Sequence, residues 1–153
     1  MLLRNLWLSS FAKVEEQHTR QDVDRALNAI SSTIENLDAI TEDWAAWDAT
    51  YEFIESMDPA YIESNLIEGT FVGLKINLIL YINQSGQLVY AKAFDYNNEE
   101  ALPIPEDISE HIGEDQVLTN HTNLESRVSG ILILQKKPLL LVSRPILTSE
   151  KKG

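Results

Sequence analysis

The sequence contains no cysteine, which excludes a disulfide framework, a thiolate zinc site and a cysteine nucleophile. It also lacks a segment apolar enough to cross a bilayer, which takes about 20 residues. The apolar opening over residues 1–8 is interrupted by Arg4 and has no cleavage site of the signal-peptide type. No glycine belongs to a phosphate-binding loop or a nucleophile elbow. We therefore expect neither an enzyme active site nor a cofactor in this chain.

Basic residues are scarce. The chain has 12 Lys and Arg against 24 Asp and Glu, a formal net charge of -12, which argues against binding nucleic acid. Residues 26–74 and 93–126 contain no Lys or Arg. The acidic stretches form either a solvated face or a cation-binding surface, but none has the spacing of a calcium loop. His121 and Glu125 are four residues apart in a predicted loop, so no metal site is expected.

Glycine and proline are absent from about Arg4 to Met57, and these are the residues that most often stop helices. One long amphipathic helix is therefore predicted over residues 1–57, about 75–80 Å long. A helix of this length usually packs against a second one. We expect a homodimer with the N-terminal half of the helix at the interface, through apolar positions that include Leu6, Phe11, Val14, Val23, Leu27, Ile30 and Ile34.

Aromatic residues gather near the end of this predicted helix. Trp44, Trp47 and Tyr51 are spaced i, i+3 and i+7, so on an uninterrupted helix they share one face. They would anchor the helix against the rest of the chain as core residues, or line a ligand pocket. We expect the core role.

Residues 58–153 form the second predicted region. Asp58-Pro59 is typical of a helix start, and this short helix should end near Gly69. Strands are predicted at 75–83 and 87–94, joined by a turn at 83–86, then a short helix at 105–113, and strands at 127–135 and 139–146. This order indicates an α+β fold, with helices to one side of an antiparallel sheet.

The aromatic run also carries a family resemblance. Its pattern is Trp44-x-x-Trp47-Asp48-x-x-Tyr51, and it is followed by Tyr61, Asn65-Leu66, Thr70-Phe71 and Asn83-x-x-Gly86. Over about residues 11–146 the chain resembles the fourth class of CHASE domains. These are extracytoplasmic sensory modules of membrane-bound histidine kinases and nucleotide cyclases. The resemblance implies a PAS-like sheet, although the fifth strand that such families often have after the second hairpin is not predicted here.

The resemblance also implies a role. We expect a non-enzymatic, extracytoplasmic ligand-sensing domain of a membrane-bound receptor, a histidine kinase by preference, that relays its state through the long helix. CHASE-type modules normally sit between two transmembrane helices, so this chain is expected to be an excised soluble domain. The alternative is a structural or adaptor domain that assembles through its helix and binds no ligand. An enzyme is a third option, favoured only if carboxylates and a histidine converge on one cleft.

The predicted sheet supplies the candidate ligand site. Alternation along the first strand assigns one face to the long helix, through Ile76, Leu78, Leu80 and Ile82. The opposite face then carries Asn77, Ile79 and Tyr81, and neighbouring strands contribute Tyr90, Lys92 and Arg144. Tyr81, Tyr90, Lys92 and Arg144 beside aliphatic residues suit a small anionic or amphipathic ligand. In the alternative, Lys92 and Arg144 lie at strand edges with their charges in solvent.

Overall fold

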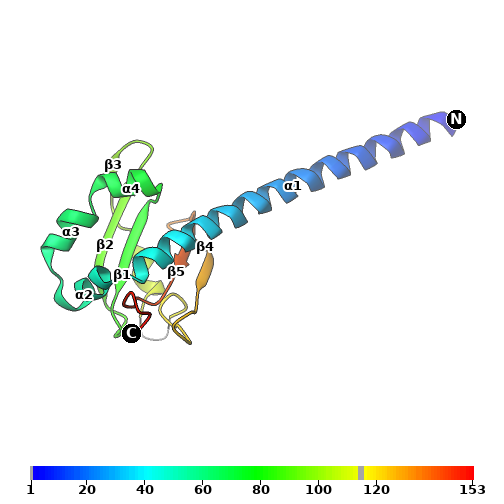
Figure 1. The fold of residues 1–153 in the computed structure, drawn as a ribbon. Coiled ribbons are helices and arrows are strands. Elements are labelled where there is room, and N and C mark those ends of the chain that lie inside the picture. Colours follow the sequence, from blue (N-terminus) through cyan, green and yellow to red (C-terminus); the bar gives the residue numbers. More distant parts are fainter. Residues whose placement is uncertain (1, 114–115) are drawn as a thin grey trace. The chain divides into compact units, whose positions relative to one another are not determined.

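The computed structural model describes the backbone of residues 2–113 and 116–153, and the side chains of Glu15, residues 17–113 and residues 116–153. The chain divides into two compact units, Met1–Asn36 and Leu37–Gly153. The first unit is helical, and the second contains further helices and all the strands found in the described residues (Figure 1).

Helix α1, Leu2–Ala45, makes up the described part of the first unit and continues into the second. Within the first unit its described side chains are mostly exposed, including Val23 at 52% and Leu27 at 56%. The Thr19 and Thr33 hydroxyls donate to backbone carbonyls one turn earlier, at 2.9 Å in both cases. The described side chains of this part of the helix contribute no member to the buried core clusters.

The predicted single helix over residues 1–57 is wrong at its C-terminal end. Helix α1 ends at Ala45, and a separate helix, α2, covers Asp48–Ser56. Trp47 between them has an extended backbone, with φ of -121° and ψ of 128°. Distant residues supply the groups that make the break possible. The Leu147 N–H donates to the Ala45 carbonyl at 2.7 Å, and the Ser149 N–H donates to the Asp48 carboxylate at 2.8 Å.

Two short helices follow. Helix α3, Pro59–Asn65, starts as predicted, because the Asp58 carboxylate accepts from the Ala60 N–H at 2.9 Å and Pro59 opens the helix. Helix α4, Glu68–Leu74, was not predicted, because Gly69 was expected to end the preceding helix. In the structure α3 ends at Asn65 and Gly69 lies inside α4. Lys75 caps the C-terminus of α4 with a left-handed backbone, at a φ of 56°.

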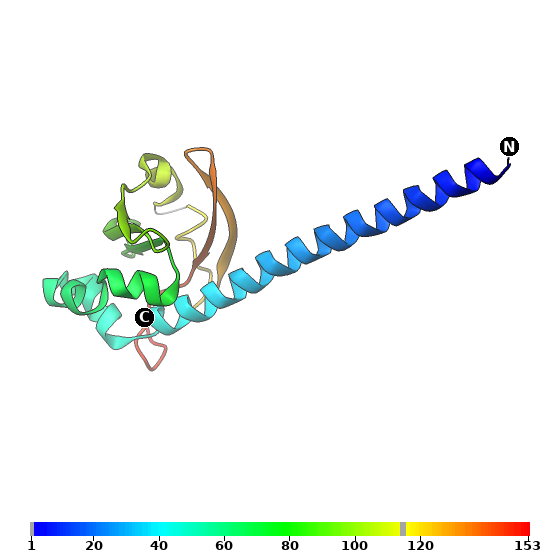
Figure 2. The same cartoon turned by 90° about the horizontal axis from the view of Figure 1, so that it is seen from above.

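The strands of the described residues form two antiparallel sheets. Strands β1 (Leu78–Ile82), β2 (Leu88–Asp95) and β3 (Glu100–Leu102) lie in the order β1-β2-β3, and β4 (Val128–Leu134) pairs only with β5 (Lys137–Ser143). A 3-10 helix, η1, covers Glu106–His111 between them. Figure 2 shows the β4–β5 hairpin from above as an element separate from the first sheet. The α+β class is confirmed, whereas the PAS-like single sheet is not.

The core of the second unit includes two clusters between the short helices and the first sheet. In the cluster that we call the aromatic cluster, Phe53 stacks on Tyr61 with ring centroids 4.6 Å apart, and the Tyr81 ring lies 5.7 Å from Phe53. The second cluster contains Phe71, Ile76 and Phe94, with Leu37 of α1 packed against it. These clusters bury the helix faces that α2, α3 and α4 turn toward β1 and β2.

The expectation that Trp47 is a core residue is wrong. Its side chain is 39% exposed, although its ring touches Trp44 and Tyr61 at centroid distances of 6.1 and 6.0 Å. Trp44 is partly buried against the aromatic cluster, as predicted. The helix break turns Trp47 away from the face that an uninterrupted helix would have given it.

Candidate functional site

Two of the four predicted ligand residues, Tyr81 and Tyr90, are direct cross-strand neighbours on β1 and β2. Their rings lie 6.2 Å apart, and both contact Phe53 of α2. They therefore face the helices, and within β1 the predicted assignment of the two faces is reversed, because Ile79 and Tyr81 pack on the core. Ile76, which precedes β1, is buried in the second cluster as predicted. Burial raises the pKa of both tyrosines, helped at Tyr81 by the Tyr61 hydroxyl, so both stay neutral near pH 7.

The buried hydroxyls of this region form a hydrogen-bond network centred on Tyr61. The Tyr61 hydroxyl lies 2.7 Å from the Thr50 hydroxyl and 3.1 Å from the Tyr81 hydroxyl. Thr50 is fully buried, and Tyr61 and Tyr81 are almost so. The three hydroxyls satisfy one another without solvent, so this hydrogen-bond network stabilises the core.

The third predicted residue, Lys92, contacts the end of α3. Its Nζ donates to the Leu66 carbonyl at 3.1 Å and lies 5.3 Å from the centroid of the Phe71 ring. An ammonium at the C-terminus of a helix and over an aromatic face is favourably placed. A ligand role for Tyr81, Tyr90 and Lys92 stays a prediction.

The fourth residue, Arg144, is in a different place, just after β5 and beside the last turns of α1. Its Nε and Nη2 donate to the two carboxylate oxygens of Asp38 at 2.7 and 2.8 Å. Arg127 donates to the same carboxylate at 2.9 Å. The Asp38 and Arg144 side chains are only 13% and 15% exposed, so the two-pronged pair is shielded from water.

The electrostatics of this pair follow from its geometry. Hydrogen bonds from Arg144, and to a smaller extent from Arg127, hold the pKa of Asp38 below its usual value. The same contact with Asp38 raises the pKa of Arg144. Asp38 is therefore an anion that fixes the orientation of Arg144. Sequence reasoning missed Asp38, whose only signal was its position one residue after the core residue Leu37.

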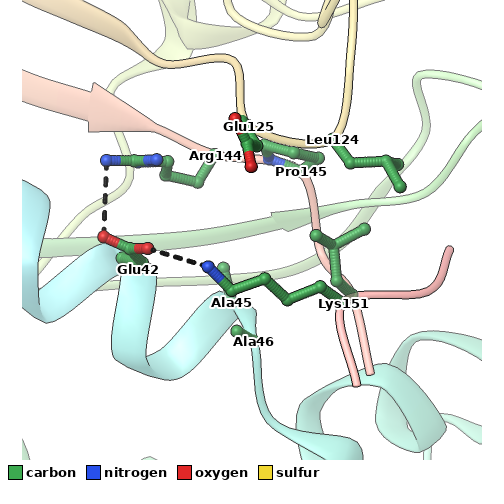
Figure 3. A pocket seen from close by; sticks show the side chains of 9 residues that line it. Glu42, Ala45, Ala46, Leu124, Glu125, Arg144, Pro145 and Lys151 are labelled. Atoms are coloured by element: carbon green, nitrogen blue, oxygen red, sulfur yellow. Dashed lines mark ion pairs between the residues drawn. The ribbon is translucent and has the colours of Figure 1, made fainter. Parts of the chain in front are cut away.

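A pocket of about 360 Å³ opens next to Arg144 (Figure 3). Glu42 stands at its edge, and one carboxylate oxygen lies 3.6 Å from Arg144 Nη2 while the other lies 3.6 Å from Lys151 Nζ. Both distances are longer than a hydrogen bond. The remaining lining residues are Ala45, Ala46, Leu124, Glu125, Pro145 and Leu147. The pocket therefore combines charges of both signs with an apolar wall.

The walls of this pocket come from three stretches of the chain. The end of α1 supplies Glu42 and Ala45, with Ala46 directly after it, and the loop before β4 supplies Leu124 and Glu125. The segment after β5 supplies Arg144, Pro145, Leu147 and Lys151. The hydrogen bond from Leu147 to Ala45 joins two of these walls directly. A molecule in the pocket would touch all three stretches at once.

A second hollow of about 300 Å³ lies beside β4 and is mostly apolar, with lining residues that include Val117, Leu118, Ile131, Leu132 and Leu141. In the described part of the chain no group of three or more His, Asp or Glu side chains is arranged to hold a metal ion. A search of the same residues finds no helix with the length and hydropathy of a membrane span.

Comparisons with known proteins agree with the sequence resemblance. A CHASE4 domain family model matches residues 29–153. The chain is similar to the methanogenesis regulatory histidine kinase FilI of Methanothrix harundinacea (strain 6Ac), with 30% identity over 149 residues. That match covers 97% of this chain but 17% of the relative, so the chain spans less than a fifth of the kinase's length. No solved structure matches the chain. The family match includes the end of α1, the aromatic cluster and every wall of the Arg144 pocket, and the chain belongs to the CHASE4 domain family, a family of sensory domains.

Proposed function

We propose that this chain is the extracytoplasmic ligand-sensing domain of a membrane-bound histidine kinase, and that it relays its ligand state through α1. The observation that carries the proposal is the Arg144 pocket, whose wall includes the last turn of α1. A ligand there would contact Glu42 and Ala45 directly, so its binding energy would depend on the position of that turn. The family membership and the kinase relative support the receptor context.

The relay depends on the continuity of α1. The helix runs from Leu2 to Ala45 as one element, and residues 2–45 contain neither glycine nor proline. In the proposed relay, a small shift or rotation of the last turn of α1 is passed along the helix. Catalysis belongs to the proposed remainder of the receptor, with a kinase preferred to a nucleotide cyclase because the relative is a kinase.

The relay can be tested in the full-length receptor with Glu42→Gln. This change removes the carboxylate that lies between Arg144 and Lys151, so we expect receptor autophosphorylation to change by about 5-fold or more. Glu35→Gln on an exposed face of the same helix is the matched control and should leave autophosphorylation unaltered. Equal autophosphorylation in all three receptors would contradict a relay that starts at this pocket.

The side of the membrane has a direct test, because the chain has no natural cysteine. Ser64→Cys places a thiol on an exposed position of α3. A membrane-impermeant maleimide should label this variant of the full-length receptor in intact cells, above the level found for the unsubstituted receptor. Labelling that occurs only after lysis would place the domain in the cytoplasm.

We also propose that the chain forms a homodimer through the N-terminal half of α1. Val23 and Leu27 are exposed, and Ile30 and Ile34 continue the stripe at steps of three and four residues, as a helix pair requires. The side chains of Leu6, Phe11 and Val14 lie outside the described residues. Sedimentation at several concentrations should show a monomer–dimer equilibrium that Leu27→Glu abolishes, with Arg25→Glu as the exposed control. A strict monomer at every concentration would refute the interface.

The same stripe is the observation that favours the alternative, an adaptor domain that assembles through its helix and binds no ligand. The two functions differ in the pocket. Substitutions at Glu42 should alter the output of a sensor, whereas an adaptor should respond only to substitutions such as Leu27→Glu.

A further inference from the structure

The Arg144 pocket has the chemistry of a site for a small zwitterion. We propose that it binds a molecule of the amino-acid or betaine type, with its anionic group between Arg144 and Lys151 and its cationic group on Glu125. This inference deepens the proposed sensor function and relies on it for biological meaning, although binding itself can be measured on this chain alone.

The guanidinium of Arg144 is already oriented in the absence of a ligand. Asp38 holds its Nε and Nη2 with hydrogen bonds of 2.7 and 2.8 Å, which fixes the plane of the guanidinium. Within the described part of the chain no hydrogen bond involves Nη1 of Arg144. Because the arginine is already oriented, a ligand carboxylate would lose less free energy to ordering it.

Glu42 occupies the place where the anionic group would sit. Its carboxylate lies 3.6 Å from both Arg144 and Lys151, which is an ion-pair distance without a hydrogen bond, and its side chain is 49% exposed. Exposed pairs of this kind contribute little free energy. A ligand carboxylate that reaches hydrogen-bond distance from Arg144 would therefore displace Glu42 readily. Figure 3 shows the two dashed contacts that it would replace.

Glu125 supplies the second half of the recognition. It lines the pocket next to Leu124 and Pro145, and in the described residues it has no ion-pair partner. With Glu42 and Glu125 against Arg144 and Lys151, the charges of the lining cancel. A simple anion would add negative charge to a neutral pocket in a protein of formal net charge -12. A zwitterion adds no net charge and gives Glu125 a partner.

The rest of the lining limits the size and character of the ligand. Leu124, Pro145 and Leu147 form an aliphatic wall, and 360 Å³ is at the lower end of the range for ligand pockets, about 300–1,000 Å³. A short aliphatic group between the two charged groups suits this wall. L-Leucine is therefore a suitable first probe.

The test uses isothermal calorimetry on the 153-residue chain with three molecules of one skeleton. L-Leucine carries both charges, isocaproate lacks the ammonium group, and isoamylamine lacks the carboxylate. We expect leucine to bind, isocaproate to bind about 5-fold more weakly, and isoamylamine about 10-fold more weakly or worse. Equal binding of isocaproate and leucine would overturn the zwitterion assignment. A lack of saturable binding by every standard amino acid and glycine betaine, up to about 10 mM, would overturn it as well.

Matched variants assign the two ends of the ligand. Glu125→Gln should reduce the difference between leucine and isocaproate to less than about 2-fold, and Lys151→Gln should weaken both. Glu63→Gln and Lys136→Gln change exposed residues outside the pocket and should leave binding unchanged. Unfolding curves verify that every variant folds. If the Glu125→Gln variant still prefers leucine over isocaproate to the full extent, the proposed role of Glu125 is contradicted.

The outcome also separates this inference from the proposed function. Zwitterion binding to this chain, with no effect on the autophosphorylation of the full-length receptor, would support the ligand class and reject the sensor function. A receptor that responds to Glu42→Gln although the chain binds no zwitterion would support the sensor function and reject the ligand class.

Discussion

The aromatic cluster and the Arg144 pocket both contact the end of α1, through Trp44 and through Glu42 and Ala45 respectively, but they differ in how tightly they are packed. The aromatic cluster is closed: Phe53 is 2% exposed and the hydroxyls of Thr50, Tyr61 and Tyr81 satisfy one another. The pocket is open, and Glu42 contacts its cations at 3.6 Å without a hydrogen bond. Dense packing resists rearrangement, whereas loose ion pairs exchange partners at low cost in free energy. The cluster therefore suits stability and the pocket suits response.

Asp38 shares properties with both the aromatic cluster and the Arg144 pocket. It is nearly as shielded as a core residue, yet it is charged and its partners are the arginines of the pocket side. Its double hydrogen bond to Arg144 makes one wall of the pocket rigid while Glu42, one turn later on the same helix, remains replaceable. The contrast between the cluster and the pocket can be sharpened by the four experiments below.

The largest effect is expected from Phe53→Ala. Removing a ring that is 2% exposed leaves a cavity among Tyr61, Tyr81 and Tyr90, so the free energy of unfolding should fall by about 3–5 kcal/mol. Urea denaturation followed by circular dichroism measures the loss. Phe53→Leu, which retains much of the volume, should lose less. A loss below about 1 kcal/mol would mean that the cluster is not the stabilising region.

A smaller loss is expected from Asp38→Asn, about 1.5–3 kcal/mol, because charge-assisted hydrogen bonds to two arginines become weaker. Asp43→Asn on an exposed position of the same helix is the control. Ligand affinity should also fall, since Arg144 loses its orientation. Identical urea midpoints for wild type and Asp38→Asn would show that the arginine pair is not stabilising.

Trp47→Ala should cost less still, about 1–2 kcal/mol, because the indole is 39% exposed and contacts only the edge of the aromatic cluster. Thermal and urea unfolding of this variant and of Phe53→Ala can be compared directly. If Trp47→Ala destabilised the protein as much as Phe53→Ala, the boundary of the core would have to be moved to include Trp47.

The dependence of stability on pH should distinguish the two regions. The Asp38 pair should affect stability on the acid side of the pH range, and Tyr81 of the aromatic cluster should affect it on the alkaline side. The pKa of Asp38 is lower in the folded protein than the unfolded value of 3.8, so its contribution is present above that value and is lost as pH falls through the folded pKa. The pKa of Tyr81 is raised above 10.0, so its contribution is present below pH 10 and is lost as pH rises further. Urea midpoints at several pH values should show the difference between wild type and Asp38→Asn shrinking on the acid side, and the difference between wild type and Tyr81→Phe changing on the alkaline side.

The elements that depend on local chemistry could be predicted from the sequence. The start of α3 follows from Asp58 and Pro59, which act on neighbouring backbone groups. The β1–β2 hairpin follows from apolar runs on either side of a turn, where the Asn83 side chain accepts from the Ser85 and Gln87 N–H groups at 3.0 and 2.9 Å. In both cases the residues that determine the structure lie within a few positions of it.

The elements that were missed depend on distant partners. The break after Ala45 is stabilised by Leu147 and Ser149, which no window around the helix contains. The two-residue alternation of β1 gives two faces but does not say which one the helices cover, and that choice was reversed at Tyr81. Arg144 was identified as a ligand residue, but its partner Asp38 lies 106 positions away.

These distant partners also bear on the order in which the chain folds. The contacts of Arg144 with Asp38 and of Ser149 with Asp48 span 106 and 101 positions, so they close long loops. Long-range contacts are made at a high entropic cost and are slow to form. During synthesis the helices and the first sheet emerge before the segment after β5 exists. The Arg144 pocket is therefore expected to assemble after the aromatic cluster, whose residues lie closer together in the sequence.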